Sequence, residues 1–119
     1  MKKICKEAKQ YNFAAVCVPP SFVRDAKQFL DGSKVKIATV IGFPLGYSST
    51  ATKVFETKEA VREGADEIDM VINVGFLKEG RYAEVKDEIS QIKKACSGKT
   101  LKVIVETCYL TESEISLVT

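Results

Sequence analysis

The chain has 119 residues, of which 45% are hydrophobic and 29% are charged, and its formal net charge is +2. This composition is typical of an ordinary globular protein, and we therefore predict one domain over residues 1–119. Lysine and arginine are spread along the chain, which argues against nucleic-acid binding, and no apolar run approaches the ~20 residues of a membrane span.

From the amino terminus, apolar residues at helical spacing predict a helix over residues 2–11. A short apolar run then predicts a strand over 14–18, which ends at two prolines. A second strand is expected over 35–43, and its last residues enter a G-F-P-L-G loop at 42–46. Between the strands lies a predicted helix at about 21–31, whose apolar face is Phe22, Val23, Ala26, Phe29 and Leu30.

The second half of the chain repeats this alternation. A helix is predicted over about 50–63, a strand over 67–73, a helix over about 81–96 and a strand over 101–106. A capping box at 111–114 predicts the start of a further helix. In the first of these helices the expected inward residues are Val54, Phe55 and Val61. In the second they are Tyr82, Val85, Ile89 and Ile92. Strands separated by helices predict βα units and a parallel sheet.

Two of the predicted strands carry charged residues among apolar ones, whereas strands covered on both faces are usually continuously apolar. Because side chains alternate, Asp69 lies on the face opposite Ile68 and Met70. If the apolar faces pack against helices, the opposite faces gather Cys17, Asp69, Asn73, Lys102 and Glu106. A polar inner face of this kind fits the interior of a closed (β/α)8 barrel, where Asp69 and Lys102, on successive strands, could pair.

Each of these residues also has a structural interpretation. A buried Asp–Lys pair is weak evidence of function, Cys17 can be an inert thiol, and polar residues at strand ends can cap loops. The four cysteines form no C-x-x-C pair and histidine is absent, so we expect reduced thiols, no metal site and no cofactor. The charged amino terminus lacks a signal-peptide core, which favours a cytoplasmic location.

Four segments of the chain resemble the deoxyribose-phosphate aldolase family. They are A-A-V-C-V-P-P-S-F-V, K-I-A-T-V-I-G-F-P-L-G, E-G-A-D-E-I-D-M-V-I-N-V-G and L-K-V-I-V-E-T-C-Y-L-T, in that order. The resemblance implies a class I aldolase on a (β/α)8 barrel. Such an enzyme reversibly joins acetaldehyde to glyceraldehyde 3-phosphate, through a lysine Schiff base, to give 2-deoxyribose 5-phosphate.

The resemblance also implies roles for three residues. Asp69 matches the catalytic aspartate, which moves protons through water during carbinolamine and Schiff-base steps. Lys102 matches an active-site lysine that does not itself form the Schiff base, and Cys17 matches a substrate-binding cysteine near the aldehyde. A nearby positive charge lowers the pKa of a Schiff-base lysine, and Lys102 could supply that charge.

Compared with the family, the chain corresponds to strands two to five, about half of the barrel. The K-T-S-T-G motif that carries the Schiff-base lysine is not among the 119 residues, so we expect little or no aldolase activity from this chain alone. The family-level partners are a small aldehyde and a sugar phosphate. Four strands leave two open sheet edges, which predict a homo-oligomer. The alternative is a non-catalytic α/β module that self-assembles, with its strands rearranged into an open sheet.

Overall fold

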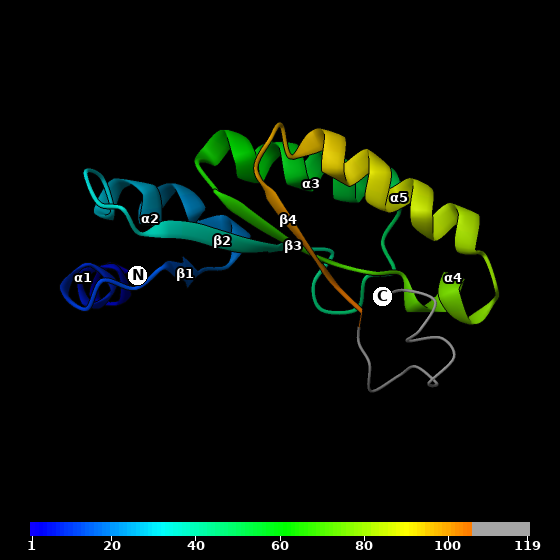
Figure 1. Cartoon of the computed structure of the whole chain (residues 1–119), viewed down its shortest axis with the longest axis horizontal. Coiled ribbons are helices and arrows are strands. Elements are labelled where there is room, and N and C mark those ends of the chain that lie inside the picture. Colours follow the sequence, from blue (N-terminus) through cyan, green and yellow to red (C-terminus); the bar gives the residue numbers. More distant parts are fainter. Residues whose placement is uncertain (106–119) are drawn as a thin grey trace.

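The structure, a computed structural model, describes residues 1–105, which contain a four-stranded sheet with all strands parallel. The strands lie side by side in chain order (Figure 1). They are β1 (Ala15–Cys17), β2 (Lys36–Ile41), β3 (Glu67–Val71) and β4 (Thr100–Ile104). This sequential order is that of a barrel segment and not of a flavodoxin-like open sheet. The helix predicted near Thr111 and the placement of Glu106 lie outside the described residues.

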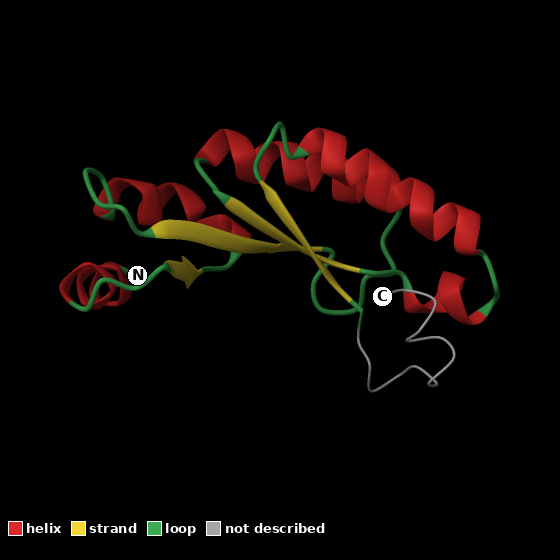
Figure 2. Cartoon of the chain, viewed as in Figure 1, coloured by secondary structure: helices red, strands yellow, loops and turns green. Residues whose placement is uncertain are grey.

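Helices connect successive strands, and α2, α3 and α5 lie along the same side of the sheet (Figure 2). The helices are α1 (Lys2–Gln10), α2 (Val23–Phe29, after a 3-10 turn at Pro20–Phe22), α3 (Thr50–Glu63), α4 (Val74–Lys78) and α5 (Tyr82–Ala95). None of these described helices is long and apolar enough to cross a membrane.

The sheet face that meets the helices is apolar and buried. Ile68 and Met70 of β3 have no exposed surface, and Leu101 and Val103 of β4 pack against the same core. Since fully burying such a side chain contributes roughly 1.5–3 kcal/mol, this core holds the helices to the sheet. The predicted assignment of the apolar strand faces to the helices is confirmed.

The inward face of α3 was predicted only in part, since Val54 and Val61 pack against the core as expected. Phe55 was predicted to point inward but is 66% exposed, whereas Lys53, Thr57 and Ala60 are buried. The lysine can take this place because a carboxylate and a backbone carbonyl bind its ammonium group inside the protein. Three other aromatic residues expected on inward helix faces are also exposed: Phe22, Phe29 and Tyr82. Single apolar residues at the surface are common and need no special explanation.

Strand β3 ends at Val71, two residues earlier than predicted, because Asn73 turns the chain into the short helix α4. The Oδ1 atom of the buried Asn73 side chain accepts a hydrogen bond from the Phe76 N–H at 3.1 Å. An asparagine that caps the following backbone competes with strand continuation and favours a helix start. This contact supports the structural interpretation of Asn73, and α4 itself was not predicted.

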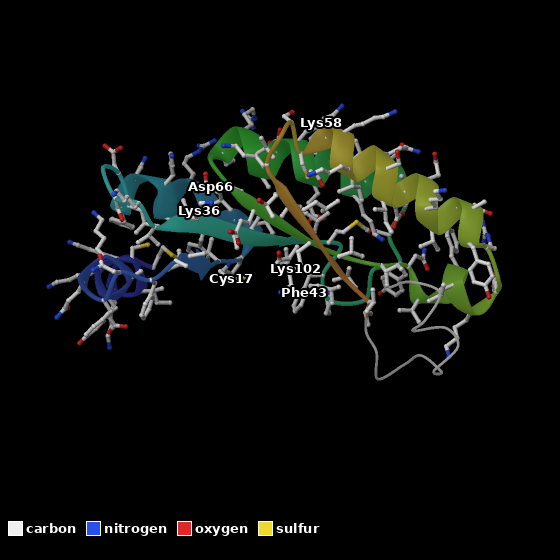
Figure 3. The ribbon with its side chains drawn as sticks, viewed as in Figure 1. Cys17, Lys36, Phe43, Lys58, Asp66 and Lys102 are labelled. Atoms are coloured by element: carbon white, nitrogen blue, oxygen red, sulfur yellow. The ribbon has the colours of Figure 1, made fainter. Side chains whose placement is uncertain are left out.

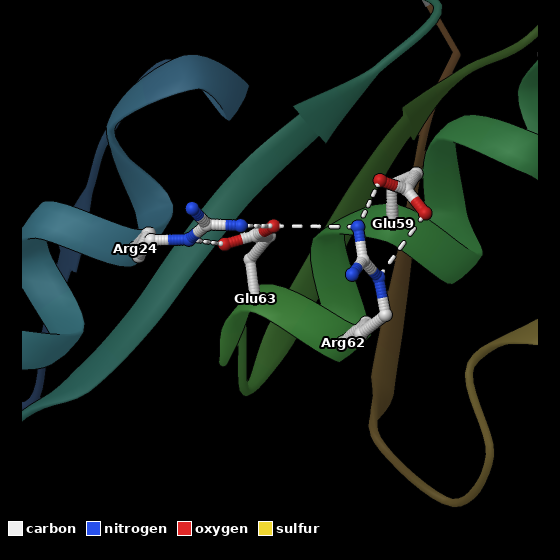
Figure 4. Close-up of polar contacts among 4 residues, drawn as sticks. All are labelled: Arg24, Glu59, Arg62 and Glu63. Atoms are coloured by element: carbon white, nitrogen blue, oxygen red, sulfur yellow. Dashed lines mark hydrogen bonds and ion pairs between the residues drawn. The ribbon is translucent and has the colours of Figure 1, made fainter.

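Helices α2 and α3 are joined on their outer surface by an ion pair between Arg24 and Glu63 (Figure 4). Arg24 donates to both carboxylate oxygens, with an Nη2–Oε1 distance of 2.5 Å. Hydrogen bonding by Arg24 lowers the pKa of the Glu63 carboxyl group. Arg62 pairs with Glu59 within α3. Exposed pairs of this kind contribute little to stability individually, and only the Arg24–Glu63 pair joins two helices.

Candidate active site

Three sequence-predicted site residues lie on the same face of the sheet, the one that points away from the helices. Strand register places Asp69 of β3 directly beside Lys102 of β4. Cys17 of β1 lies beside Ala38, which in turn lies beside Glu67, two residues before Asp69. Because side chains alternate along each strand, Cys17, Asp69 and Lys102 share one face. In Figure 3, Cys17 and Lys102 lie on the side of the sheet away from α3.

The expected direct ion pair between Asp69 and Lys102 is not formed. Asp69 is partly buried and Lys102 is exposed, and no ion pair joins these two described side chains. An exposed lysine keeps its ammonium group in water on a flexible stem, so it gains little by pairing. The carboxylate of Asp69 is tolerated without a direct counter-charge because its face of the sheet stays open to solvent.

The charges of Asp69 and Lys102 both act on the pKa of the Cys17 thiol. Desolvation raises its pKa, the negative charge of Asp69 raises it further, and the positive charge of Lys102 lowers it. Both charged groups lie on the sheet face that carries Cys17, and we call Cys17, Asp69 and Lys102 the inner-face cluster. A raised pKa keeps the thiol protonated at neutral pH, which suits a binding role better than a nucleophilic one. Among residues 1–105, no three thiol or carboxylate groups gather to hold a metal ion.

A pocket of about 470 Å³ opens beside Cys17 at the carboxyl ends of β1 and β2. Its size falls within the usual range for small-molecule sites. Phe43 is 62% exposed, and in Figure 3 it lies on the same side of the sheet as Lys102. The lining residues are Cys17, Val18, Pro19, Pro20, Val40, Phe43 and Glu56. Of these, only Cys17 was predicted from the sequence as a site residue.

The G-F-P-L-G loop at residues 42–46 places Phe43 at this pocket. The Gly42 N–H donates to Glu56 Oε1 of α3 at 2.9 Å. Gly46 has a φ of +70°, and a Cβ added there would lie 2.2 Å from the carbonyl oxygen of Ile72. Only glycine fits such a position, so Gly46 allows the loop to pack closely against the end of β3.

A buried ion pair that was not predicted lies beneath this loop. The Lys53 Nζ donates to Glu88 Oε1 at 2.6 Å and to the carbonyl oxygen of Val71 at 3.0 Å. The sequence carries one signal for it, because Glu88 interrupts an otherwise apolar row on α5. The buried residues of that row are Val85, Glu88, Ile92 and Ala95. A carboxylate within an apolar helix face indicates a buried partner.

Comparison with known proteins identifies the family. A family model described as DeoC/LacD family aldolase matches residues 1–116. The chain belongs to this aldolase family. The deoxyribose-phosphate aldolase of Coprothermobacter proteolyticus is 60% identical over 114 residues, which cover 96% of this chain and 52% of that protein.

Solved structures of the same family have the same fold. A crystal structure assigned as a deoxyribose-phosphate aldolase from Coccidioides immitis has a TM-score of 0.96 and 45% identity, and the match covers 98% of this chain and 46% of that one. The tetrameric deoxyribose phosphate aldolase from Aeropyrum pernix has a TM-score of 0.82 and 27% identity, over 98% of this chain and 49% of that one. The chain therefore spans about half the length of its DeoC/LacD relatives, and it has the predicted fold of about half a (β/α)8 barrel.

Proposed function

We propose that residues 1–119 form one partial barrel domain, located in the cytoplasm, that supplies part of a deoxyribose-phosphate aldolase active site. The reaction is the reversible cleavage of 2-deoxyribose 5-phosphate to glyceraldehyde 3-phosphate and acetaldehyde. The observation that carries the proposal is the cluster of Cys17, Asp69 and Lys102 on one sheet face, in a chain of the aldolase family. In a closed barrel this face is the interior, and catalytic residues collect near the carboxyl ends of its strands.

The chemistry needs several proton transfers. A lysine amine adds to the C1 carbonyl of the sugar phosphate, and loss of water from the carbinolamine gives an imine. Removal of the C3 hydroxyl proton then breaks the C2–C3 bond, which releases glyceraldehyde 3-phosphate and leaves an enamine. Protonation at C2 and hydrolysis release acetaldehyde. Asp69, on the open face of β3, carries these protons through a water molecule.

Lys102 has an electrostatic role in this proposal, and Cys17 has a role in substrate binding. Lys102 supplies a positive charge that lowers the pKa of the imine-forming lysine, so that more of this amine is neutral. Cys17, as a protonated thiol, lines the part of the pocket that receives the aldehyde. The imine-forming lysine of the family belongs to a K-T-S-T-G motif, which is not among the 119 residues. The 119 residues alone are therefore expected to form no catalytic imine.

A chimeric enzyme tests this assignment. Residues 1–116 replace the matching segment of the Coprothermobacter aldolase, and cleavage of 2-deoxyribose 5-phosphate is measured. We expect an active chimera in which Asp69→Asn lowers kcat roughly 10²- to 10⁴-fold, the usual contribution of a proton-transfer group. The matched control Lys58→Met, on the outer side of α3, should leave kcat unchanged. A folded, active chimera with no dependence on Asp69 would refute the assignment.

A second candidate is a non-catalytic half-barrel module that assembles with copies of itself. The observation that favours it is the pair of sheet edges: among the described strands, β1 pairs only with β2, and β4 pairs only with β3. Unpaired strand edges are templates for another chain. This candidate requires no role for Asp69, so the chimera distinguishes the two.

A further inference from the structure

Lys53 is a fully buried cation on the face of α3 that meets the sheet. Its side chain has no exposed surface and that of Glu88 is 3% exposed, and the Lys53 Nζ lies 2.6 Å from Glu88 Oε1. The ammonium group also donates to the backbone carbonyl of Val71 at 3.0 Å. Thr50 donates to the second carboxylate oxygen of Glu88 at 2.7 Å. The pair therefore connects α3 and α5 to the carboxyl end of β3.

The same lysine also contacts the end of β2. A Cβ added at Gly42 would lie 2.8 Å from the Lys53 Cε, so the lysine stem packs directly against this glycine. One turn further along α3, Glu56 accepts the Gly42 N–H. At the other end of the loop, Gly46 packs against the Ile72 carbonyl, one residue beyond the carbonyl that Lys53 binds. Lys53 thus lies between the ends of β2 and β3.

A buried ion pair is an inefficient way to gain stability. Removing two charges from water costs free energy that their attraction repays only in part, and apolar residues of similar volume often serve equally well. An apolar pair cannot, however, direct a hydrogen bond to one carbonyl oxygen. What this pair adds beyond packing is therefore the fixed position of the Val71 carbonyl relative to α3 and α5.

We propose that Lys53 and Glu88 are positioning residues that fix the carboxyl end of β3, and with it Asp69 and the 42–46 loop. Asp69 lies two residues before Val71, and the two side chains share one face of β3. A displaced strand end would therefore move the Asp69 carboxylate relative to Lys102. The catalytic importance of this positioning rests on the proposed function, because that function gives Asp69 its role. The position of the β3 end itself can be measured without aldolase activity.

The test replaces both residues together with apolar residues of similar size, Lys53→Met and Glu88→Leu, in the 119-residue chain. Urea unfolding measures global stability, and amide hydrogen exchange measures local order. We expect a urea midpoint close to that of the parent. The amides of Gly46 and Ile72, which are hydrogen-bonded at the two strand ends, should nevertheless exchange roughly tenfold faster or more.

Two controls distinguish a local loss of order at the strand ends from a general loosening of the fold. The amide of Ala65, near the amino end of β3, should exchange within about twofold of the parental rate in the double variant. Thr57→Val is the matched variant, because the Thr57 hydroxyl donates to the Lys53 carbonyl within α3 at 2.8 Å and does not reach the strand end. It should leave the exchange of Gly46 and Ile72, relative to Ala65, unchanged.

Three results would overturn the proposal. Parental exchange at Gly46 and Ile72 in the double variant would show that apolar packing places the strand end by itself. A double variant that fails to fold would show that the pair acts on stability and not on position. Equal acceleration at these amides in Thr57→Val would show that any change in α3 loosens them.

Discussion

Asp69 lies partly exposed on its sheet face, beside Lys102 in the strand register but without a direct ion pair to it. Fully burying an isolated carboxylate would cost several kcal/mol, and an exposed ion pair would repay at most about 1 kcal/mol. Because Asp69 is partly exposed, its carboxylate avoids the cost of full burial and needs no ion pair to compensate for it. A carboxylate that remains open to solvent can also hold the water through which protons move.

The reactivity of Cys17 should report the two neighbouring charges. Asp69 raises the thiol pKa and Lys102 lowers it, and only the thiolate reacts with iodoacetamide. At pH 8, Asp69→Asn should therefore speed alkylation of Cys17, and Lys102→Met should slow it, each by roughly twofold to fivefold. Alkylation is followed by peptide mass mapping, with Lys58→Met as the control. Changes in the same direction for both variants would contradict the cluster.

Gly46 should tolerate no side chain. Its φ is +70°, and a Cβ would lie 2.2 Å from the Ile72 carbonyl oxygen. Gly80 has a similar φ of +75° but no atom within 4 Å of such a Cβ, so it is the matched control. By urea unfolding, Gly80→Ala should cost about 1 kcal/mol for the strained backbone alone, and Gly46→Ala about 3 kcal/mol or more. Equal losses would mean that the loop moves away without cost.

The contact between helices α2 and α3 should weaken in acid. Arg24 holds the pKa of Glu63 below its ordinary value, so the pair stabilises the fold fully above the unfolded-state pKa. That stability is lost as the pH falls through the lower, folded-state pKa. The urea midpoints of the parent and of Glu63→Gln should therefore differ slightly at pH 7 and converge near pH 2. A difference that grows on acidification would contradict this sign.

The strands could be predicted from sequence because alternation gives each residue only two possible faces. Ile68 and Met70 fixed the buried face of β3, and the remaining face then had to carry Asp69. The helix faces were harder, because a helix offers many orientations. For α3 the inward positions of Val54 and Val61 were predicted correctly, whereas Phe55 is exposed and Lys53 is buried by a salt bridge instead. The apolar row around Glu88 on α5 was the one signal in the sequence for this buried pair, and it did not say which cation Glu88 binds.

The site residues on strands could likewise be predicted from the sequence, whereas those on the loop and the helix could not. Cys17, Asp69 and Lys102 could be predicted because each lies on a strand whose register follows from the parallel βα order. Phe43 and Glu56 of the pocket could not, since the course of the 42–46 loop depends on contacts from α3. Helix α4 was missed because it is only five residues long and begins at an asparagine cap within an expected strand.

For the whole molecule, the two edges of the described sheet predict self-association. The unpaired backbone groups of β1 and β4 can be satisfied by a second copy whose strands run in the same direction. Sedimentation velocity at tens of micromolar protein should show a species of about twice the monomer mass, which dissociates on dilution. A strictly monomeric protein at that concentration would contradict the proposed pairing of edges.

We propose that Asp69 and Lys102 assist an imine-forming lysine and do not replace it. The most direct measurement is intact mass after incubation of the 119-residue chain with acetaldehyde and borohydride, beside Lys102→Ala. Borohydride reduces an imine to a stable adduct of fixed added mass. We predict no adduct that depends on Lys102, because its exposed side chain lacks the desolvated pocket that activates a Schiff-base lysine. An adduct on the parent that disappears in Lys102→Ala would show instead that Lys102 is itself the nucleophile.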